Sequence, residues 1–495
     1  SDQVSTSTYT ATTNDGNKTA KLVNQLFKNI QRSQLGNFFT IPTDCPQRNE
    51  RMGWTGDAQA YSRTATYNSD ARRFLRQWMA SLRADQGVGD ETNVPGGIGS
   101  TVPTYNKADD PTFADGTTWS AAICMVPWQL YTQYGDVQVI EENIEAMMNW
   151  LNGMDFYDFS EQYPHLSKKA SGLADWLAMD NNTPSDLVNN AIYIYMMEVT
   201  AQMADAIGRP DYAAMLRERH DLAKAEWNLA YVDPATGKTK SADGKLVHSQ
   251  ASYATPLNFN CFNDQFKPKA EQYLSELAAN PSASGAGDKK YPAYTITTGF
   301  SGTPNILPSL SRAGKTEDAF RMFTCTDFTS WLYPVTKGAT SVWERWNGLE
   351  VAFGPNNQNN MNSFNHFALG AVGQWMYEYQ LGIKGTDQGY KHFVLQPSVG
   401  AMYTSLKGDY ESHYGMIHSE WTADGTGNML TYTATIPANT VATVYVPVKE
   451  GVSEGLSIDG AKFEKITTNN KVRVAEYTVA SGTYTFEMGE KVVVK

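Results

Sequence analysis

Apolar residues recur at helical spacing from about residue 16 to residue 385. The stretch SDARRFLRQWMASLRADQ, residues 69–86, opens with a helix-capping pair, Ser69 and Asp70. Its apolar residues share one helix face: Phe74, Leu75, Trp78, Met79 and Leu82. Residues 139–151 and 185–208 repeat this pattern, and Gly208 is a plausible helix C-cap. The chain has room for about a dozen helices, separated by long loops such as 87–117 and 233–256.

The period changes at about residue 390, where apolar and polar residues begin to alternate. The alternating apolar positions include Leu430, Tyr432, Ala434 and Ile436, then Val444, Val446 and Val448, then Tyr484, Phe486 and Met488. Turn signals such as Asp424-Gly425 separate these runs, which is typical of an antiparallel β-sandwich. We therefore predict a tail or linker at 1–15, a mainly α domain at 16–387 and a small antiparallel β-sandwich at 388–495.

Composition narrows the function classes. A chain of 495 residues exceeds one ordinary core, so two domains or a large toroid with a small domain are expected. Its net charge of −12 supplies no basic footprint for nucleic acid. The sequence has no apolar run long enough for a membrane span. Its 12 Trp, 27 Tyr and 20 Phe suit a large core or a protein that binds sugars.

The four cysteines, Cys45, Cys124, Cys261 and Cys325, are widely spaced and form no metal-binding or disulfide pattern. The chain begins Ser-Asp-Gln without Met or an apolar leader, so we expect a processed or trimmed chain. The sequence leaves the compartment and the oligomeric state open, with a secreted or periplasmic location favoured over a cytoplasmic one.

The stretch DCPQRNERMGWTGDAQ, residues 44–59, crowds ionised side chains around a tryptophan. Its Pro and Gly residues predict a loop that leads into a helix beginning near residues 55–57. Such a loop can aim several polar groups into one cavity. The alternative is a solvated surface loop with ordinary ion pairs.

Two further stretches combine aromatic and polar residues. SVWERWNG, residues 341–348, sets Glu344 and Arg345 between two tryptophans, and SFNHFALGAVGQWMYEY, residues 363–379, places His366 at a helix start. The alternatives are a Trp-rich core helix with one exposed Glu and a structural histidine. Two acidic clusters beside Trp on a helical domain suggest glycoside hydrolysis, which uses one protonated carboxyl group and one carboxylate.

These residues resemble those of glycoside hydrolase family 78, the α-L-rhamnosidases. DCPQRNERMGWTGDAQ is similar to the family's signature loop almost residue for residue. PWQLYTQYGD (127–136), ADWLA (174–178), SVWERWNG and SFNHFALGAVGQWMY match later family blocks in order. The resemblance covers about residues 16–420.

The resemblance implies an (α/α)6 barrel that releases terminal α-L-rhamnose with inversion, without cofactor or metal. It implies that Glu50 is the general acid and Glu344 the general base. The residues that it implies for substrate binding are Asp44, Arg48, Trp54, Asp57, Trp119, Trp176 and His366. The implied partner is a rhamnosylated glycoside or polysaccharide.

The chain departs from the family pattern at three places. It has Ala121 where the family often has Asp, Ala174 where Gly is usual, and Asn49 in place of an Asp in the signature. Family members also often carry β-domains before the barrel, so we expect this chain to be a fragment or a minimal form. Three alternatives remain open: an inverting hydrolase of another α-linked sugar, a non-catalytic carbohydrate-binding homologue and, as the weakest, a purely structural helical toroid.

Overall fold

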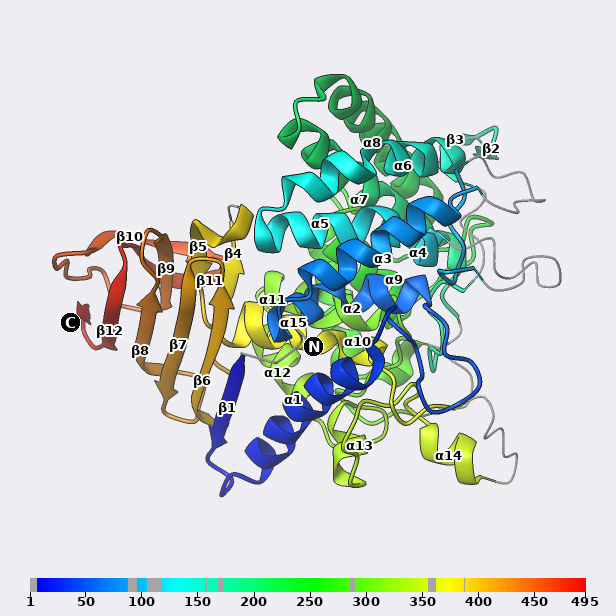
Figure 1. Ribbon diagram of the computed structural model, residues 1–495. Coiled ribbons are helices and arrows are strands. Elements are labelled where there is room, and N and C mark those ends of the chain that lie inside the picture. Colours follow the sequence, from blue (N-terminus) through cyan, green and yellow to red (C-terminus); the bar gives the residue numbers. More distant parts are fainter. Residues whose placement is uncertain are drawn as a thin grey trace.

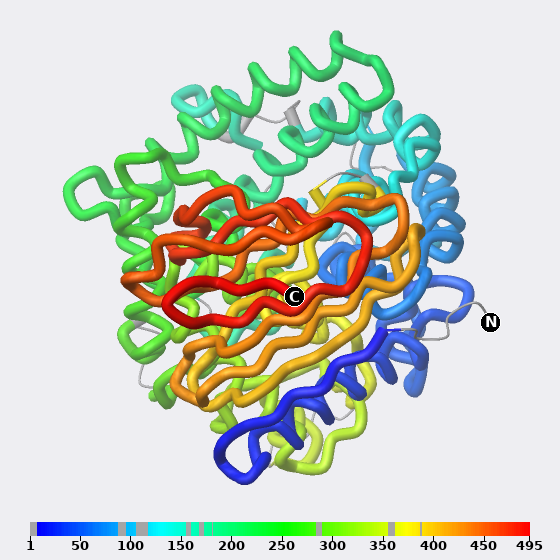
Figure 2. The backbone as a smooth tube through the Cα atoms, turned by 90° about the vertical axis from the view of Figure 1, so that its left-hand side faces the viewer, coloured from blue at the N-terminus to red at the C-terminus, as the bar shows by residue number. Residues whose placement is uncertain are grey.

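The computed structural model of the protein describes residues 7–87, 96–104, 117–155, 158–167, 173–180, 182–284, 290–354, 362–386 and 388–495. Helices form one body of the molecule, and β-sheets form a second body against one end of it (Figure 1). Seen from that end, the strands lie in front of the helices (Figure 2). Within the described residues, no helix is both long enough and apolar enough to cross a membrane.

The helical body is a closed ring of inner helices wrapped by outer ones. The inner elements are α2 (Thr55–Asn68), α5 (Ala122–Tyr134), α7 (Ser185–Ala206), α9 (Gln250–Asn258), α11 (Thr303–Arg312) and the run of η4 (Ala368–Ala371), α15 (Val372–Trp375) and the π-helix η5 (Met376–Gln380). Each contacts the next, and α15 returns to α2, which closes the ring. The outer helices are α1 (Lys18–Asn37), α3 (Arg72–Asp85), α6 (Val137–Asp155), α8 (Pro210–Tyr231), α10 (Lys267–Ala279) and α12 (Thr316–Thr324).

Burial follows from the sequence pattern of each helix. Inner helix α2 buries every residue except Ala60, because neighbours surround it. Outer α3 buries only the stripe Leu75, Trp78, Met79 and Leu82, close to the face predicted from spacing. Inner and outer helices alternate along the chain, so all inner helices run in one direction. Their N-termini therefore meet at one end of the ring, and the prediction of a mainly α (α/α)6 barrel is confirmed.

Short elements fill the connections. They are α4 (Thr117–Ser120), β2 (Asp158–Ser160), β3 (Tyr163–Ser167), η2 (Pro281–Ser284), α13 (Leu332–Thr336), α14 (Gly348–Phe353) and η6 (Gln388–Tyr390). Most of the loop predicted at 87–117 lies outside the described residues. The loop predicted at 233–256 is shorter, because α9 already begins at Gln250 with a capping box built by Ser249 and Ser252.

Two sheets form the C-terminal sandwich. One has the order β1-β6-β7-β8-β12-β13 and the other β10-β11-β9-β5-β4. The strands are β1 (Thr8–Thr13), β4 (Ile383–Gly385), β5 (His392–Leu395), β6 (Tyr403–Ser412), β7 (Gly415–Ala423), β8 (Met429–Ile436), β9 (Val441–Pro447), β10 (Ala461–Asn469), β11 (Val472–Val479), β12 (Gly482–Met488) and β13 (Val492–Val494). Tyr477 and Phe486 pack across the two sheets with ring centroids 4.9 Å apart.

The sandwich differs from the prediction in three respects. Residues 8–13 are not a tail: β1 is an edge strand whose Thr8 faces Asp409 of β6. Its Ser/Thr-rich composition hides an alternation in which Tyr9, Ala11 and Thr13 are buried. Strand β4 already joins the second sheet ahead of the predicted boundary at 387/388. The sandwich is also mixed, because β5 pairs with β9 in parallel.

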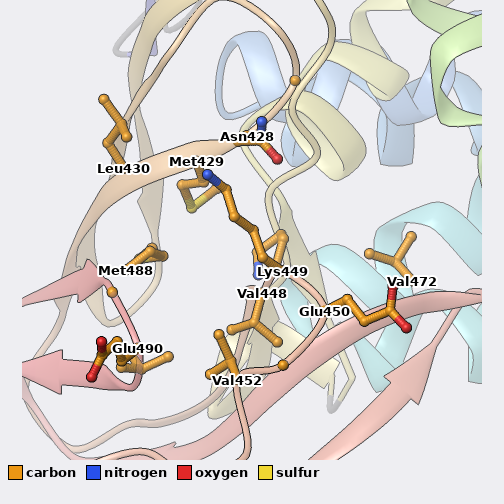
Figure 3. Close-up of a pocket in the computed structure, with 15 residues that line it drawn as sticks. Asn428, Met429, Leu430, Val448, Lys449, Glu450, Val452, Val472, Met488 and Glu490 are labelled. Carbon is orange, nitrogen blue, oxygen red and sulfur yellow. The ribbon is translucent and has the colours of Figure 1, made fainter.

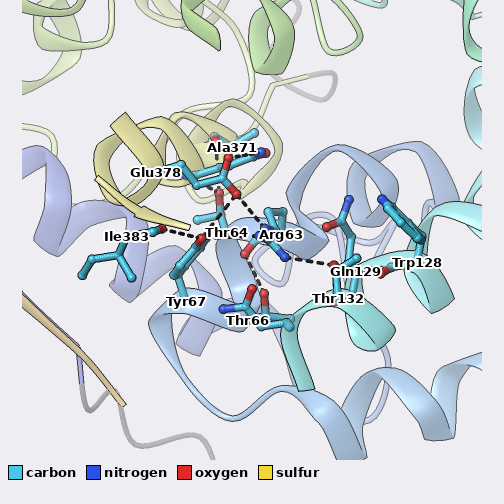
Figure 4. Close-up of polar contacts among 12 residues, drawn as sticks. Arg63, Thr64, Thr66, Tyr67, Trp128, Gln129, Thr132, Ala371, Glu378 and Ile383 are labelled. Carbon is cyan, nitrogen blue, oxygen red and sulfur yellow. Dashed lines mark hydrogen bonds and ion pairs between the residues drawn. The ribbon is translucent and has the colours of Figure 1, made fainter. Parts of the chain in front are cut away.

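A buried ion pair joins α2 to the π-helix η5 where the barrel meets the sandwich (Figure 4). Arg63 Nε donates to Glu378 Oε1 at 2.8 Å, and Arg63 Nη1 donates to Thr132 at 3.1 Å. The hydroxyl of Tyr67 reaches the Glu378 carboxylate at 3.3 Å and the Ile383 carbonyl at 2.9 Å. These contacts fix α2 at the end of the barrel opposite its N-terminus.

Candidate active site

The predicted polar residues gather at the N-terminal ends of the inner elements, at the end of the barrel away from the sandwich (Figure 1). Asp57 lies in the first turn of α2, and His366 lies two residues before the start of η4. Helix N-termini carry partial positive charge and unpaired N–H groups, so carboxylates are favoured there. As predicted, α2 begins at Thr55 after an irregular loop.

That loop folds back on itself through Asp44. Its amide donates to the Met52 carbonyl at 2.9 Å, and its carboxylate Oδ1 accepts the Met52 amide at 2.9 Å. Arg51, inside the turn, has a left-handed backbone with φ 55°. The closed loop brings Arg48 and Glu50 to the same side as Trp54.

Glu50 is held at both carboxylate oxygens. Trp54 Nε1 donates to Oε1 at 2.6 Å, and the Arg48 guanidinium contacts Oε2. The Glu50 side chain keeps 24% of its surface exposed, so it is the more accessible of the two predicted catalytic carboxylates. An arginine and an indole therefore face one carboxylate, as the composition of the loop suggested.

Glu344 approaches the same arginine from a distant part of the chain. Its Oε2 lies 3.8 Å from Arg48 Nη2, and its side chain is only 5% exposed. The Glu344 amide donates to the Ser363 carbonyl at 3.0 Å, and Gln47 Nε2 donates to the Ser363 hydroxyl at 2.7 Å. Residues 341–347 are not helical, which corrects the alternative of a Trp-rich core helix. Because one nitrogen of Arg48 contacts both carboxylates, Glu50 and Glu344 face one small space.

Asp57 and His366 form a second buried pair beside these residues. Asp57 Oδ1 lies 2.6 Å from His366 Nε2, and both side chains are less than 5% exposed. Burial alone would lower the pKa of His366, but Asp57, Glu344 and Asp44 together raise it to about 9. A charged imidazolium at this position offsets part of the negative charge of the site.

Asp44 is the most strongly perturbed acid of the loop. Burial raises its pKa to about 7; His366 opposes this rise, and the charges of Glu50 and Asp57 add to it. Its Oδ2 is buried without a hydrogen-bond partner among the described residues. A proton on this carboxyl group at neutral pH would provide a donor inside the site.

The predicted tryptophans take different places. Trp119 is buried against Gly56, where an added Cβ would lie 2.4 Å from the indole. Trp176 is half-buried and lines a pocket of about 520 Å³ with Arg345 and Asn347. Phe300 links Trp176 to the rest of the site. Its amide donates to the Trp176 carbonyl, and its ring centroid lies 5.6 Å from that of His366.

One trio within the described residues has the composition of a metal site: Asp44, Cys45 and Glu50. The residues do not fit this role well. Arg48 already brings a positive charge against Cys45 and Glu50. Burial, with Asp44 and Glu50 nearby, raises the pKa of the Cys45 thiol far above its ordinary value, whereas metal ligation needs a thiolate.

A larger pocket of about 770 Å³ opens in the sandwich (Figure 3). Its labelled side chains are mainly aliphatic, with Lys449, Glu450 and Glu490 as charged groups, and none of its 15 lining residues is aromatic. It offers neither a stacking surface nor a pair of facing carboxylates. The charged site at the barrel end is therefore the better candidate.

Comparison with known families agrees with this geometry. Residues 17–380 match the bacterial alpha-L-rhamnosidase 6 hairpin glycosidase domain, and residues 382–460 match the corresponding C-terminal domain. The chain belongs to the bacterial α-L-rhamnosidase family. The resemblance to glycoside hydrolase family 78 is thereby confirmed.

Individual relatives of this family support the assignment. The chain is 33% identical over 429 residues to an alpha-L-rhamnosidase of Streptomyces avermitilis, covering 86% of this chain and 38% of the relative. It is 32% identical over 479 residues to one of Formosa agariphila, covering 94% of this chain and 47% of that one. The chain thus spans less than half the length of these relatives.

Solved structures of rhamnosidases superpose on most of the chain. The Streptomyces avermitilis alpha-L-rhamnosidase complexed with L-rhamnose has a TM-score of 0.80 and 30% identity, over 97% of this chain and 42% of that one. An alpha-L-rhamnosidase from Aspergillus terreus gives 0.80 with 27% identity, over 99% and 50%.

Sequence reasoning missed some neighbours of the site. Cys45 contacts both Arg48 and Glu50, although its spacing from other cysteines gave no sign of a role. Ser363 links the loop to Glu344, and its position beside His366 was the available signal. At the departures from the family pattern, Ala121 and Ala174 are buried small residues, and Ala121 simply precedes α5.

Proposed function

We propose that the protein hydrolyses the bond to a terminal α-L-rhamnose with inversion, with Glu50 as general acid and Glu344 as general base. The observation that carries the proposal is the contact of one arginine with both carboxylates at the open end of the barrel. Inverting hydrolysis needs two carboxyl groups on opposite faces of a sugar, with room for a water beside the base. Membership in the rhamnosidase family supports the choice of sugar.

The two carboxylates differ in ways that suit the two roles. Glu50 is the more exposed and can reach the glycosidic oxygen, to which it would donate a proton. Glu344 is almost buried and would take a proton from the water that attacks the anomeric carbon.

The remaining polar groups are proposed to bind the sugar. Asp57, paired with His366, would accept hydrogen bonds from sugar hydroxyls. Trp54 and Trp176, which are both partly exposed, would pack the apolar face of the ring and its methyl group. Trp119 is 1% exposed and would support the site from behind Gly56. The substrate is therefore a rhamnosylated glycoside or polysaccharide, whose leaving group we leave open.

The test is incubation of the protein with an aryl α-L-rhamnoside while proton NMR follows the anomer first released. Release of the β anomer is expected. Initial release of the α anomer would contradict the roles of Glu50 and Glu344. No release by a folded protein, with turnover of another α-linked glycoside, would favour the alternative sugar. Binding of rhamnose without any turnover would favour a binding role.

Two variants test the roles proposed for Glu50 and Glu344. Glu344→Gln is expected to abolish turnover and leave the circular dichroism spectrum unchanged. Glu50→Gln is expected to impair substrates with poor leaving groups most, because activated aryl groups need little protonation. Equal impairment on both kinds of substrate would argue against Glu50 as the acid. Glu487→Gln, an exposed glutamate of the sandwich, is the control.

A further inference from the structure

Cys45 is a buried thiol between two members of the proposed catalytic machinery. It has no exposed surface. Arg48 Nε donates to its Sγ at 3.0 Å, and its thiol lies 3.6 Å from Glu50 Oε2. No role for this cysteine follows from acid–base hydrolysis, although it contacts both the acid and the arginine that joins the acid to Glu344.

The protonation state of Cys45 limits what it can do. Burial, followed by the charges of Asp44 and Glu50, raises its pKa far above the ordinary value. A protein thiol with a raised pKa is a poor nucleophile and resists oxidation. A neutral thiol, however, both donates and accepts hydrogen bonds. Cys45 can therefore accept from Arg48 and donate to Glu50 at the same time.

The contact of Cys45 with Arg48 Nε fixes the orientation of the Arg48 guanidinium. The five N–H groups of a guanidinium lie in one rigid plane, so a contact at Nε fixes the direction of the other nitrogens. Arg48 Nη2 is the atom that contacts both Glu50 and Glu344. The thiol thus restricts where this nitrogen can go.

We propose that Cys45 is a positioning residue, whose neutral thiol anchors the Arg48 guanidinium and hydrogen-bonds to Glu50, and so fixes the arginine relative to the acid. The inference rests on the proposed roles of Glu50 and Glu344. It extends them by assigning a function to a side chain that has no exposed surface. Serine, which also donates and accepts, is the conservative replacement, and alanine removes both contacts.

The test compares Cys45→Ala and Cys45→Ser on two rhamnosides, one with an activated aryl leaving group and one with a sugar leaving group. Loss of a hydrogen bond to a charged group is expected to lower kcat/KM of Cys45→Ala about tenfold or more on the sugar-linked substrate. The loss on the aryl substrate should be smaller, because it depends less on the acid. The acid-dependent limb of the pH profile should also move, and Cys45→Ser should recover most of both effects.

Cys261→Ala is the matched control, since Cys261 is equally buried and its thiol lies near backbone carbonyls remote from the proposed site. It should leave the substrate ratio and the pH profile unchanged. Equal loss on both substrates, an unmoved pH profile, or a serine variant no better than alanine would overturn the proposal. If Cys45→Ala fails to fold, the serine variant and Cys45→Val carry the same comparison. A wild type inactive on both rhamnosides would instead refute the proposed function.

Discussion

The ion pair between Arg63 and Glu378 allows a quantitative test of how strongly α2 is held to the π-helix η5. The two side chains are 9% and 7% exposed, and Glu378 also accepts from Gln374 at 3.1 Å. Glu378→Gln keeps the shape of the side chain but leaves the guanidinium charge buried without a carboxylate. Removing one partner of a buried pair costs about 3–5 kcal/mol. We expect the free energy of unfolding of the barrel to fall by this amount.

The assay is urea unfolding followed by tryptophan fluorescence, with hydrogen exchange of peptides from α2 to identify the barrel transition. The exposed pair of Glu487 with Lys495 is the control, and Glu487→Gln should cost less than about 1 kcal/mol. Replacing Arg63 and Glu378 together by methionine should cost less than either single change. A loss below about 1 kcal/mol for Glu378→Gln, or additive losses in the double variant, would refute the reasoning.

The difference in unfolding free energy between the wild type and Glu378→Gln should depend on pH with a definite sign. Burial would raise the pKa of Glu378, but Arg63 and its other partners lower it below 4.5. A carboxyl group with a lowered pKa contributes stability above its ordinary pKa and loses it as the pH falls through the folded value. The gap between the wild type and Glu378→Gln should therefore narrow in acid.

Three further changes test the site. Gly56→Ala places a methyl group 2.4 Å from the Trp119 indole, so lower activity and a lower melting temperature are expected in parallel assays; an unchanged melting temperature would contradict this contact. Burial would lower the pKa of His366 but its carboxylate partner raises it to about 9, so its contribution to stability is complete below 6.5 and lost as the pH rises through 9. The melting temperature should therefore depend less on pH in His366→Gln than in the wild type between pH 6.5 and 9. The same pH dependence in both proteins would argue against the buried charge. Trp54→Phe removes the donor 2.6 Å from Glu50 but keeps an aromatic ring, so kcat on a sugar-linked rhamnoside should fall with little change in KM; an unchanged kcat would remove this hydrogen bond from the mechanism.

Local pattern predicted much of the helical body. The stripe of α3 and the start of α2 at Thr55 follow from apolar spacing and from Pro and Gly in the preceding loop. Gly208 takes the left-handed conformation expected after a helix, with φ 71°. The cap of α3 is only partly as predicted: Asp70 accepts the Arg72 amide at 3.1 Å, whereas Ser69 lies outside the helix.

Contacts between distant segments could not be predicted from periodicity. Asp57 and His366 are 309 positions apart, and only closure of the inner ring brings α2 beside the segment before η4. The resemblance placed both residues in one pocket without stating that they pair. Strand β1 was missed for the same reason, since a six-residue strand rich in threonine reads as a strand only beside its partner.

The placement of β1 has a consequence for how the protein is made. The Thr8 hydroxyl donates a hydrogen bond to Asp409, which is 401 positions later. Strand β1 therefore cannot pair until the whole barrel has been synthesised. Chains leave the ribosome N-terminus first, at about 5–20 residues per second. At this rate, β1 stays without its partner strand for at least tens of seconds after it is synthesised. During this time it can pair with another copy of the chain. Within the finished fold, β1 pairs with β6 just ahead of α1, and β4 pairs with β5 just after the last inner element, so the barrel is joined to the sandwich at both of its ends.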